Sequence, residues 1–313
     1  MTAAEAGRWA GAPVTVSPLE GVELRVGAVA TPGRPLWWAV TRGLFAQSGL
    51  ELSLRLPRGK DELTPPPFLA PVMTKLIGFA REGRLTEGQV VEWPRPFGPG
   101  VETDLGVFAL TIDPAFGTIR TAHDAVPVLL AVGLTADEAR LVREWSPQGL
   151  LEVLARLDPT LSTSVERASL LSSPRARQAI EQRVEREGSS MGVLVAERSE
   201  LSGKDKATWT LDTRSCDALV SLLKGRLGHQ RPFTVRSATS SVEVVPADSD
   251  AFTASGNQAT LKLTQPTSRA LRANLKPLPG RYRWDDLPNL TIEVKPGTEL
   301  RPPPSTPAVN VPS

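Results

Sequence analysis

Side chains that commonly bind metals or act as nucleophiles are scarce in this sequence. It contains two histidines, His123 and His229, and a single cysteine, Cys216. Their spacing matches neither a C-x-x-C nor an H-E-x-x-H zinc motif. Cys216 lies inside an apolar helical pattern, which is typical of a small buried side chain rather than of a reactive thiol. We therefore predict no metal site, no catalytic residue and no cofactor.

The acidic and basic side chains also have structural interpretations. Glu51 and Arg55 lie on the polar face of one predicted strand, where their spacing suits a surface ion pair. Asp113 is predicted to form a turn, and Glu138 to complete a helix capping box. An enzyme with a site built from Glu51, Arg55, Asp113 and His123 is the least favoured of three functional hypotheses. We expect that the protein is not an enzyme.

These residues are set among strands and helices that are predicted to build a core. Residues 50–56 alternate strictly between apolar and polar side chains, which predicts a half-buried antiparallel strand. Residues 107–157 predict a strand, an Asp-Pro turn, a strand over 126–132 that is covered on both faces, and an amphipathic helix that begins at Thr135. Residues 161–171 are interpreted as a further strand. More helices are predicted over residues 68–81, 173–187, 215–224 and 266–274.

Length and composition predict two domains. The 313 residues are 40% hydrophobic, which is enough for two cores. We expect a fold of class α/β (mixed α+β), in which each domain is a mixed or antiparallel sheet packed with helices. The composition predicts a disordered N-terminus over residues 1–17, a first domain over 18–196, a linker over 197–207, a second domain over 208–300 and a disordered Pro-rich tail over 301–313.

Charge and hydropathy argue against two classes of partner. The 36 basic and 34 acidic residues leave a net charge of +2, and no long basic run is present, which argues against direct binding of nucleic acid. No apolar run approaches the roughly 20 residues of a membrane span. The N-terminus lacks the apolar region of a signal peptide, and the single cysteine fits a reducing compartment. These patterns predict a cytoplasmic protein that binds no membrane.

Several stretches of the chain resemble the suppressor of fused (Sufu) family. The first is W-W-A-V-T-R-G-L at residues 37–44, which is similar to the family's W-H-x-x-x-x-G-L segment. The others are residues 48–56, with the proline-rich run at 65–68; residues 110–154, with an Asp-Pro turn and G-L-L-E-V-L; residues 223–234 (L-K-G-R-L-G-H-Q-R-P-F-T); and the Y-R-W at 282–284. The resemblance covers nearly the whole chain and is to two-domain members of the family.

The resemblance implies two mixed α/β domains that clamp a protein partner. In the animal proteins the partner is a Gli-type transcription factor, whose short peptide is added between a strand of the first domain and the strand leaving it. This is β-augmentation. Here the flanking strands would be residues 89–93 and 192–195, and a proline at Val91 is expected to weaken binding by removing a ladder donor. The implied partner-binding residues are Gln89, Val91, Trp93, Val193, Val195, Arg214 and Ala218.

Three of these positions depart from the family pattern. Gln89 stands where the family's clamp uses an aspartate to hold a histidine of the peptide. Arg214 stands where the second domain contributes an acidic residue, and Ala218 replaces a leucine nearby. Losing one carboxylate and reversing the charge at another position disfavours the same histidine-containing peptide.

Two non-enzymatic functions follow from the resemblance. The departures, together with a composition rich in Ala, Arg and Pro, suggest a bacterial source. Bacterial members of the family are inferred to be immunity proteins of polymorphic toxin systems, which neutralise a toxin domain by binding it. The alternative is a cytosolic regulator that sequesters a transcription factor or another protein. The identity of the adjacent genes would separate these two functions.

Overall fold

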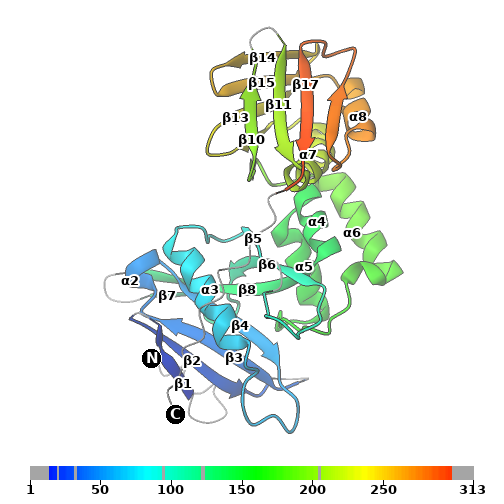
Figure 1. The fold of residues 1–313 in the computed structure, drawn as a ribbon. Helices are drawn as coiled ribbons and strands as arrows, with labels where there is room; N and C mark the ends of the chain where they lie inside the picture. Colours follow the sequence, from blue (N-terminus) through cyan, green and yellow to red (C-terminus); the bar gives the residue numbers. More distant parts are fainter. Residues whose placement is uncertain are drawn as a thin grey trace, which may run out of the picture. The chain divides into compact units, whose positions relative to one another are not determined.

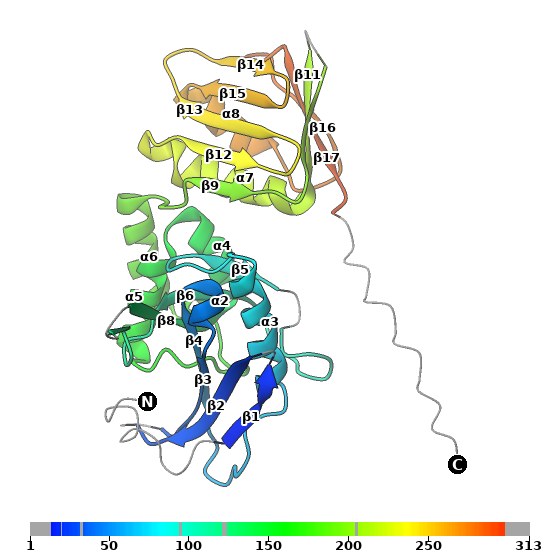
Figure 2. The same cartoon turned by 90° about the vertical axis from the view of Figure 1, so that its left-hand side faces the viewer.

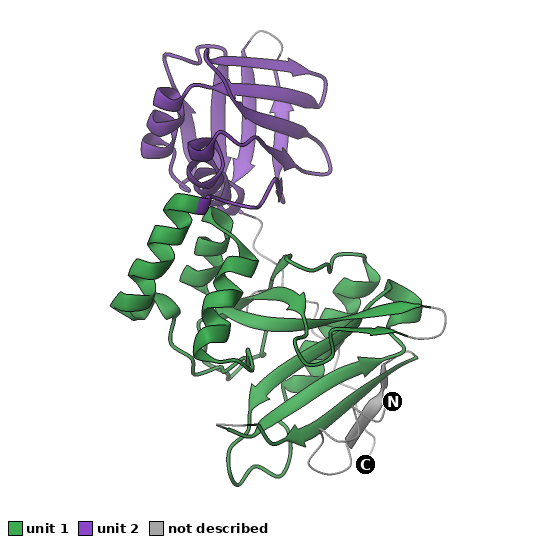
Figure 3. Cartoon of the chain, turned by 180° about the vertical axis from the view of Figure 1, so that it is seen from behind, with its two compact units in different colours: residues 1–186 green, residues 187–313 purple. Residues whose placement is uncertain are grey.

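Three β-sheets of mixed strand direction form the framework of the protein (Figure 1). The structure is a computed structural model, and it describes residues 14–297 apart from residues 20, 32–33, 94–95, 121–123 and 204–205. The chain divides into two compact units, Met1–Arg186 and Glu187–Ser313 (Figure 3). The described residues contain seven α-helices together with these sheets, which confirms the predicted mixed α/β class.

The first unit is built on one large sheet with the strand order β1-β2-β3-β4-β8-β6-β5, and the short β7 pairs with β8. The central strands β4 and β8 run parallel, and each pairs antiparallel with its other neighbours. The strands are β1 (Val14–Leu19), β2 (Val22–Val29), β3 (Leu36–Arg42), β4 (Glu51–Pro57), β5 (Val90–Glu92), β6 (Leu105–Ile112), β7 (Thr118–Arg120) and β8 (Ala125–Thr135).

Helices cover this sheet. Helix α3 packs against β4, and helices α4 and α5 pack against β6. The helix predicted over residues 68–81 is confirmed as α3, whose apolar side chains recur every three or four residues and are buried. The helices are α2 (Phe45–Ser48), α3 (Leu69–Arg81), α4 (Ala136–Glu144), α5 (Pro147–Leu157), the single 3₁₀ turn η1 (Leu170–Ser172) and α6 (Pro174–Glu187).

Strand β4 is buried on both faces rather than half-buried. It lies between β3 and β8, and its polar residues Glu51, Ser53 and Arg55 are buried, as its leucines are. Arg55 forms an ion pair with Asp113, while Glu51 accepts a hydrogen bond of 2.6 Å from the Thr41 hydroxyl. The predicted surface ion pair between Glu51 and Arg55 is therefore wrong. Alternation identifies the polar side chains of a strand but cannot tell whether distant residues cover them.

The amphipathic stretch after β8 forms two helices instead of one. Helix α4 begins with the predicted capping box, in which the backbone N–H of Thr135 donates to Glu138 at 3.0 Å. The helix ends before Trp145, and Ser146 caps α5 by accepting a hydrogen bond of 3.2 Å from the N–H of Gly149. A Ser-Pro pair begins this second helix, which is the same signal that correctly predicts the start of α6.

No strand forms over residues 161–171, where one was predicted. The chain there is irregular until the turn η1, and Leu161 has a φ of 49°, which an extended strand does not accommodate. Thr163 holds the segment in place: its N–H donates to the carbonyl of Arg55 at 2.8 Å, and its hydroxyl accepts from the N–H of Gly133 at 2.9 Å. Isolated hydrogen bonds to two strands replace a continuous ladder.

The second unit contains two sheets. A four-stranded sheet has the order β10-β11-β17-β16, and a five-stranded sheet has the order β14-β15-β13-β12-β9 (Figure 2). One buried cluster that includes Trp209, Leu222, Val244 and Ile292 joins both sheets to α7. The elements are β9 (Val193–Val195), β10 (Ser199–Ser202), β11 (Ala207–Asp212), α7 (Thr213–Gly225), η2 (Leu227–His229), β12 (Phe233–Arg236), β13 (Ser241–Pro246), β14 (Ala251–Ser255), β15 (Gln258–Leu263), α8 (Gln265–Asn274), β16 (Gly280–Arg283) and β17 (Leu290–Lys295).

The boundary between the units precedes the linker predicted over residues 197–207. Strand β9 pairs with β12 and so belongs to the second unit, and β10 occupies part of the predicted linker by pairing with β11. The polar sequence S-E-L-S conceals β10 because only Leu201 is apolar. At the N-terminus, residues 14–16 pair with β2 although they were predicted to be disordered. The rest of that segment, residues 1–13, and the predicted tail over 301–313 lie outside the described residues.

Candidate functional site

Strand β5 is an edge of the first unit's sheet, and it presents backbone groups of Val90 and Glu92 outward. The carbonyl of Gln89 and the N–H of Trp93 both bind β6, at 3.0 and 2.9 Å. Bonded pairs in an antiparallel ladder recur at every second residue, so Val91 also faces β6. The N–H and C=O groups of Val90 and Glu92 therefore point away from the sheet. A proline at Val91 would break the β5–β6 pairing itself, so the informative positions are Val90 and Glu92.

The side chains predicted to bind a partner at β5 are largely engaged by the first unit. Val91 is buried in the core. The ring of Trp93 packs edge-on against Phe79, with centroids 6.5 Å apart and an interplanar angle of 85°. Gln89 uses its side-chain oxygen to accept a hydrogen bond of 2.9 Å from the N–H of Thr86. The β5 edge therefore offers mainly its backbone.

Strand β9 is an edge of the five-stranded sheet in the second unit. It pairs in parallel with β12, to which the carbonyl of Gly192 and the N–H of Ala196 are bonded at 3.0 and 2.8 Å. Backbone groups of alternate residues face the same neighbour, so those of Val193 and Val195 point outward. The side chains of Val193 and Val195 are 49% and 79% exposed, whereas Leu194 points into the core. This edge offers both backbone groups and apolar side chains.

The two remaining predicted residues lie on α7 in the second unit. Arg214 forms an ion pair of 3.3 Å with Glu197, and each side chain is about half exposed. Ala218, which was predicted to bind a partner, is 3% exposed and belongs to the core of the second unit. Its position in the second turn of α7 faces inward because the helix buries its apolar stripe against the sheets.

The structure brings together part of the quartet considered for catalysis. Arg55 and Asp113 form a buried ion pair, and Glu51 binds elsewhere, while His123 lies outside the described residues. The carboxylate of Asp113 also accepts from the Ser53 hydroxyl at 2.5 Å and from a backbone N–H in the following turn. Asp113 and Arg55 are 0% and 4% exposed. Asp113 accepts several hydrogen bonds, and both side chains are shielded from solvent, so the pair joins strand β4 to the turn that follows β6.

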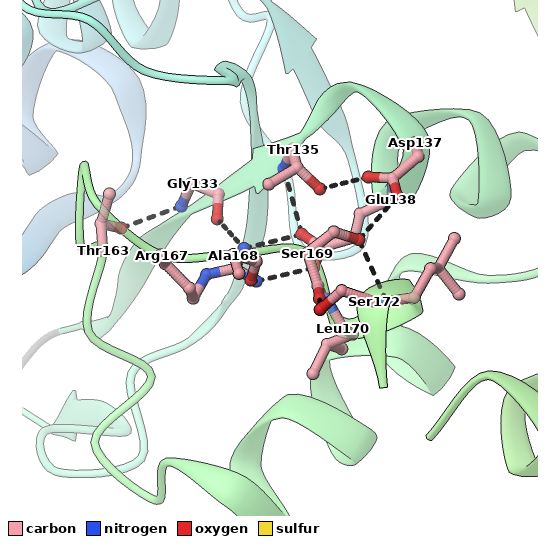
Figure 4. Close-up of polar contacts among 11 residues, drawn as sticks. Gly133, Thr135, Asp137, Glu138, Thr163, Arg167, Ala168, Ser169, Leu170 and Ser172 are labelled. Atoms are coloured by element: carbon pink, nitrogen blue, oxygen red, sulfur yellow. Dashed lines mark hydrogen bonds and ion pairs between the residues drawn. The ribbon is translucent and has the colours of Figure 1, made fainter. Parts of the chain in front are cut away.

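A second polar cluster, in which Glu138 is buried and Arg167 is partly buried, holds the irregular segment before α6 against the start of α4 (Figure 4). The carboxylate of Glu138 accepts two hydrogen bonds of 2.6 Å from the guanidinium of Arg167, and it also accepts from the N–H of Leu170 at 2.8 Å. Burial alone would raise the pKa of Asp137, but hydrogen bonds from Thr135 and Ser169 lower it by more. The pKa of Asp137 therefore lies below its usual value. Sequence patterns predicted the cap but gave no sign of Arg167.

A serine motif escaped the sequence-based predictions. Residues 188–192 read G-S-S-M-G and so match the pattern G-x-S-x-G with Ser190 in the centre. In a nucleophile elbow this pattern follows a strand and begins a helix. Here it follows helix α6 and precedes strand β9, which is the reverse order. Gly188 has a φ of +63°, and a Cβ at this position would clash with the ring of His229, so this glycine serves a tight turn.

The thiol of Cys216 is predicted to react very slowly in the folded protein. It is buried and lies 3.3 Å from the carbonyl of Lys276. Burial, assisted by the charges of Asp217 and Asp212, raises its pKa to about 12. At pH 8 we expect labelling by a thiol reagent to be at least ~10³-fold slower than for a free cysteine of pKa ~8.5. Stopped-flow labelling in buffer and in denaturant checks this, and fast labelling without unfolding would contradict the buried position.

Within the part of the chain that the structure describes, no three His, Cys, Asp or Glu side chains gather in a group that could hold a metal ion. The same residues contain no helix with both the length and the apolar composition needed to cross a membrane.

Comparison with known proteins connects the first unit to one family. A family model described as Suppressor of fused protein (SUFU) matches residues 30–168. This stretch is SUFU-like. It includes strands β3, β4, β8, β6 and β5, and therefore the β5 edge. The mouse protein named Suppressor of fused homolog is 29% identical over 156 residues, which are 47% of this chain and 32% of the mouse protein. The SUFU-like match thus spans about a third of that relative.

Solved structures extend the likeness to the fold of the second unit. The crystal structure of Drosophila Suppressor of Fused has a TM-score of 0.65 and covers 90% of each chain. Its sequence identity of 16% makes this a likeness of fold. A chain in the structure of the Sufu-Fu complex is similar over 54% of this chain, with a TM-score of 0.46 and 18% identity. For the second unit, the match to the Drosophila structure shows a similar fold and nothing more.

Proposed function

We propose that the protein is a non-enzymatic SUFU-type binding module that takes an extended segment of a protein partner by strand addition at β5 and β9. One observation carries the proposal. Both strands named by the sequence resemblance lie at sheet edges and turn backbone groups outward, at Val90 and Glu92 in β5 and at Val193 and Val195 in β9. An edge of this kind is a template for another strand.

The side chains of β9 support the proposal further. Natural edge strands are usually protected against pairing by lysine, proline or an inward charge. Strand β9 instead places two exposed valines on one side of its outer edge. Exposed β-branched side chains favour the addition of a strand because they pack against side chains of the incoming chain. The clamp that would grip one segment with both edges stays a prediction.

Proline variants test strand addition, and each has a control at the same position. Glu92→Pro and Val195→Pro remove outward N–H groups, whereas Glu92→Gln and Val195→Thr keep them. We expect peptides selected from a random library by the full chain to lose at least ~10-fold in affinity for a proline variant, because the ladder loses a donor. The controls should bind within about threefold of the original chain. Unchanged affinity for both folded proline variants would refute strand addition.

The class of partner is a finer part of the proposal. The predicted immunity protein would bind a toxin domain, and the alternative regulator would sequester a transcription factor or another protein. The bacterial source behind the first choice remains a prediction. Capture of partners by the original chain and by Val195→Pro, followed by expression of each lost partner alone, separates the classes. A toxin stops growth of its host, and the intact chain restores that growth.

A further inference from the structure

Two arginines, Arg226 and Arg236, lie beside the two ends of β9, and neither forms an ion pair with a carboxylate among the described residues. In the register of the five-stranded sheet, Arg236 on β12 lies beside Val195, and Thr234 lies beside Val193. Paired residues share a face, so Arg236 and the exposed valines stand on the same open side of the sheet. Within the described residues, Arg236 is exposed and forms no ion pair. One end of the edge therefore combines apolar surface with an uncompensated positive charge.

The other end of β9 is also positive. The guanidinium of Arg226 lies beside Gly192, since a Cβ built there would be 3.7 Å from its Nη2 atom. Arg226 donates to two backbone carbonyls, those of Ser189 and Pro232, and Arg231 donates to the carbonyl of Glu187. Backbone carbonyls carry no net charge, so these hydrogen bonds do not neutralise Arg226 or Arg231. Burial lowers the pKa of Arg226, and the charge of Arg231 lowers it further, as expected where positive charges lack compensation.

Two carboxylates near β9, those of Glu197 and Glu243, do not neutralise the positive charge of these arginines. Glu197, two residues after β9, is engaged by Arg214 at 3.3 Å. Glu243 on β13 shares the open face, but it lies beside Thr234 and is two strands away from β9. Strands are ~4.8 Å apart, so a residue on a strand added to β9 would be about 9.6 Å from Arg236 and farther from Glu243. An arginine and a glutamate side chain together span that distance.

We propose that β9 selects an acidic extended segment of a protein partner, in which two apolar residues at alternate positions are flanked by Asp or Glu on the same face. The inference rests on the strand addition proposed above and adds the chemistry of the segment. The apolar residues would pack beside Val193 and Val195, and the flanking carboxylates would meet Arg236 and Arg226. A second copy of this chain fits less well, because pairing β9 with β9 would bring two sets of arginines together.

Two fluorescent peptides test the charge preference with the full chain. The peptide E-T-V-T-V-T-E places valines and acids on one face, and K-T-V-T-V-T-K is its matched control. We expect the acidic peptide to bind at least about tenfold more tightly by fluorescence anisotropy, and the difference to shrink in about 0.5 M salt. Arg236→Glu should reverse or abolish the preference, while the exposed Arg269→Glu on α8 should leave it unchanged.

Each outcome decides one of the two proposals. Equal affinity for the peptides, or no binding of the acidic peptide up to about 1 mM, overturns the charge preference. Tight binding of the acidic peptide that survives Val195→Pro overturns strand addition at β9 while showing that the arginines attract acids. Selection of library peptides that is lost in Val195→Pro but shows no acidic preference keeps strand addition and rejects the acidic segment. Dimerisation that Val195→Pro abolishes would assign the edge to a second copy instead.

Discussion

Replacing Asp113 with alanine is expected to lower the free energy of unfolding of the first unit by about 3–5 kcal/mol. The variant leaves the guanidinium of Arg55, which is 4% exposed, buried without its carboxylate. It also removes the acceptor of the Ser53 hydroxyl and of the N–H of Ala115. Denaturant unfolding of the full chain, followed by hydrogen exchange of first-unit amides, measures the change.

Two controls show whether the charge pair causes this loss. In the double variant Arg55→Met with Asp113→Leu, neither charge of this pair is left buried alone, so we expect its destabilisation to be at least about 1 kcal/mol smaller than the sum of the single variants. It should not be fully repaired, because the N–H of Ala115 still loses the hydrogen bond that the carboxylate of Asp113 accepts. Glu82→Ala breaks an exposed pair with Arg84 and should cost less than about 0.5 kcal/mol. Strict additivity of the two buried substitutions would contradict the proposed coupling.

The substitution Glu138→Gln should destabilise the first unit by about 2–3 kcal/mol and loosen the segment before α6. The carboxylate accepts from both guanidinium nitrogens of Arg167 and from two backbone N–H groups. An amide turns one acceptor into a donor that faces other donors, and charge-assisted hydrogen bonds are lost. Amide exchange of Thr163 and Leu170 should accelerate more than exchange in β2, which lies far from the cluster in the strand order.

The capping box provides the matched control. Thr135→Ala alters the cap while it keeps the carboxylate of Glu138 and its pairing with Arg167, so we expect a loss of about 1 kcal/mol and little change in the exchange of Leu170. If Thr135→Ala and Glu138→Gln had equal effects on that segment, Glu138 would act as a helix cap alone, and the bridge to Arg167 would have no role in holding the chain.

Local sequence patterns predicted helices and strands correctly where residues close together in the sequence determine the structure. Examples are the apolar stripe of helix α3, the apolar run of strand β8 and the Ser-Pro pair at the start of α6, each of which is visible within a few residues. The predictions failed where distant residues decide. Strand β4 looked half-exposed because Asp113, which covers Arg55, is far along the chain. Residues 161–171 were predicted to form a strand, but hydrogen bonds with β4 and β8 hold Thr163 in an irregular segment. These partners are distant in the sequence, so the local pattern could not reveal them.

For the candidate site, too, part could be predicted from the sequence and part depends on distant residues. The resemblance located the two edge strands, but it could not say which residues of each strand face outward, because this depends on ladder pairing. Thus Val91 was predicted as the site of a disruptive proline, although its N–H faces β6. The burial of Ala218 depends on the packing of α7, and the open charge of Arg236 depends on the register between β9 and β12. Neither the packing of α7 nor the register between β9 and β12 can be recognised from a short stretch of sequence.

The position of β4 also bears on how the first unit forms during synthesis. A ribosome releases β1 to β4 before residues 58–124 and β8 exist, so the growing chain first has a meander whose last strand lacks its outer neighbour. At that stage Glu51 already has its partners Thr41, Gly43 and Phe45, whereas Arg55 lacks Asp113 and can remain hydrated. We therefore expect Arg55 to lose its water only when the turn at Asp113 and strand β8 dock, because Asp113 supplies its carboxylate and β8 pairs with β4.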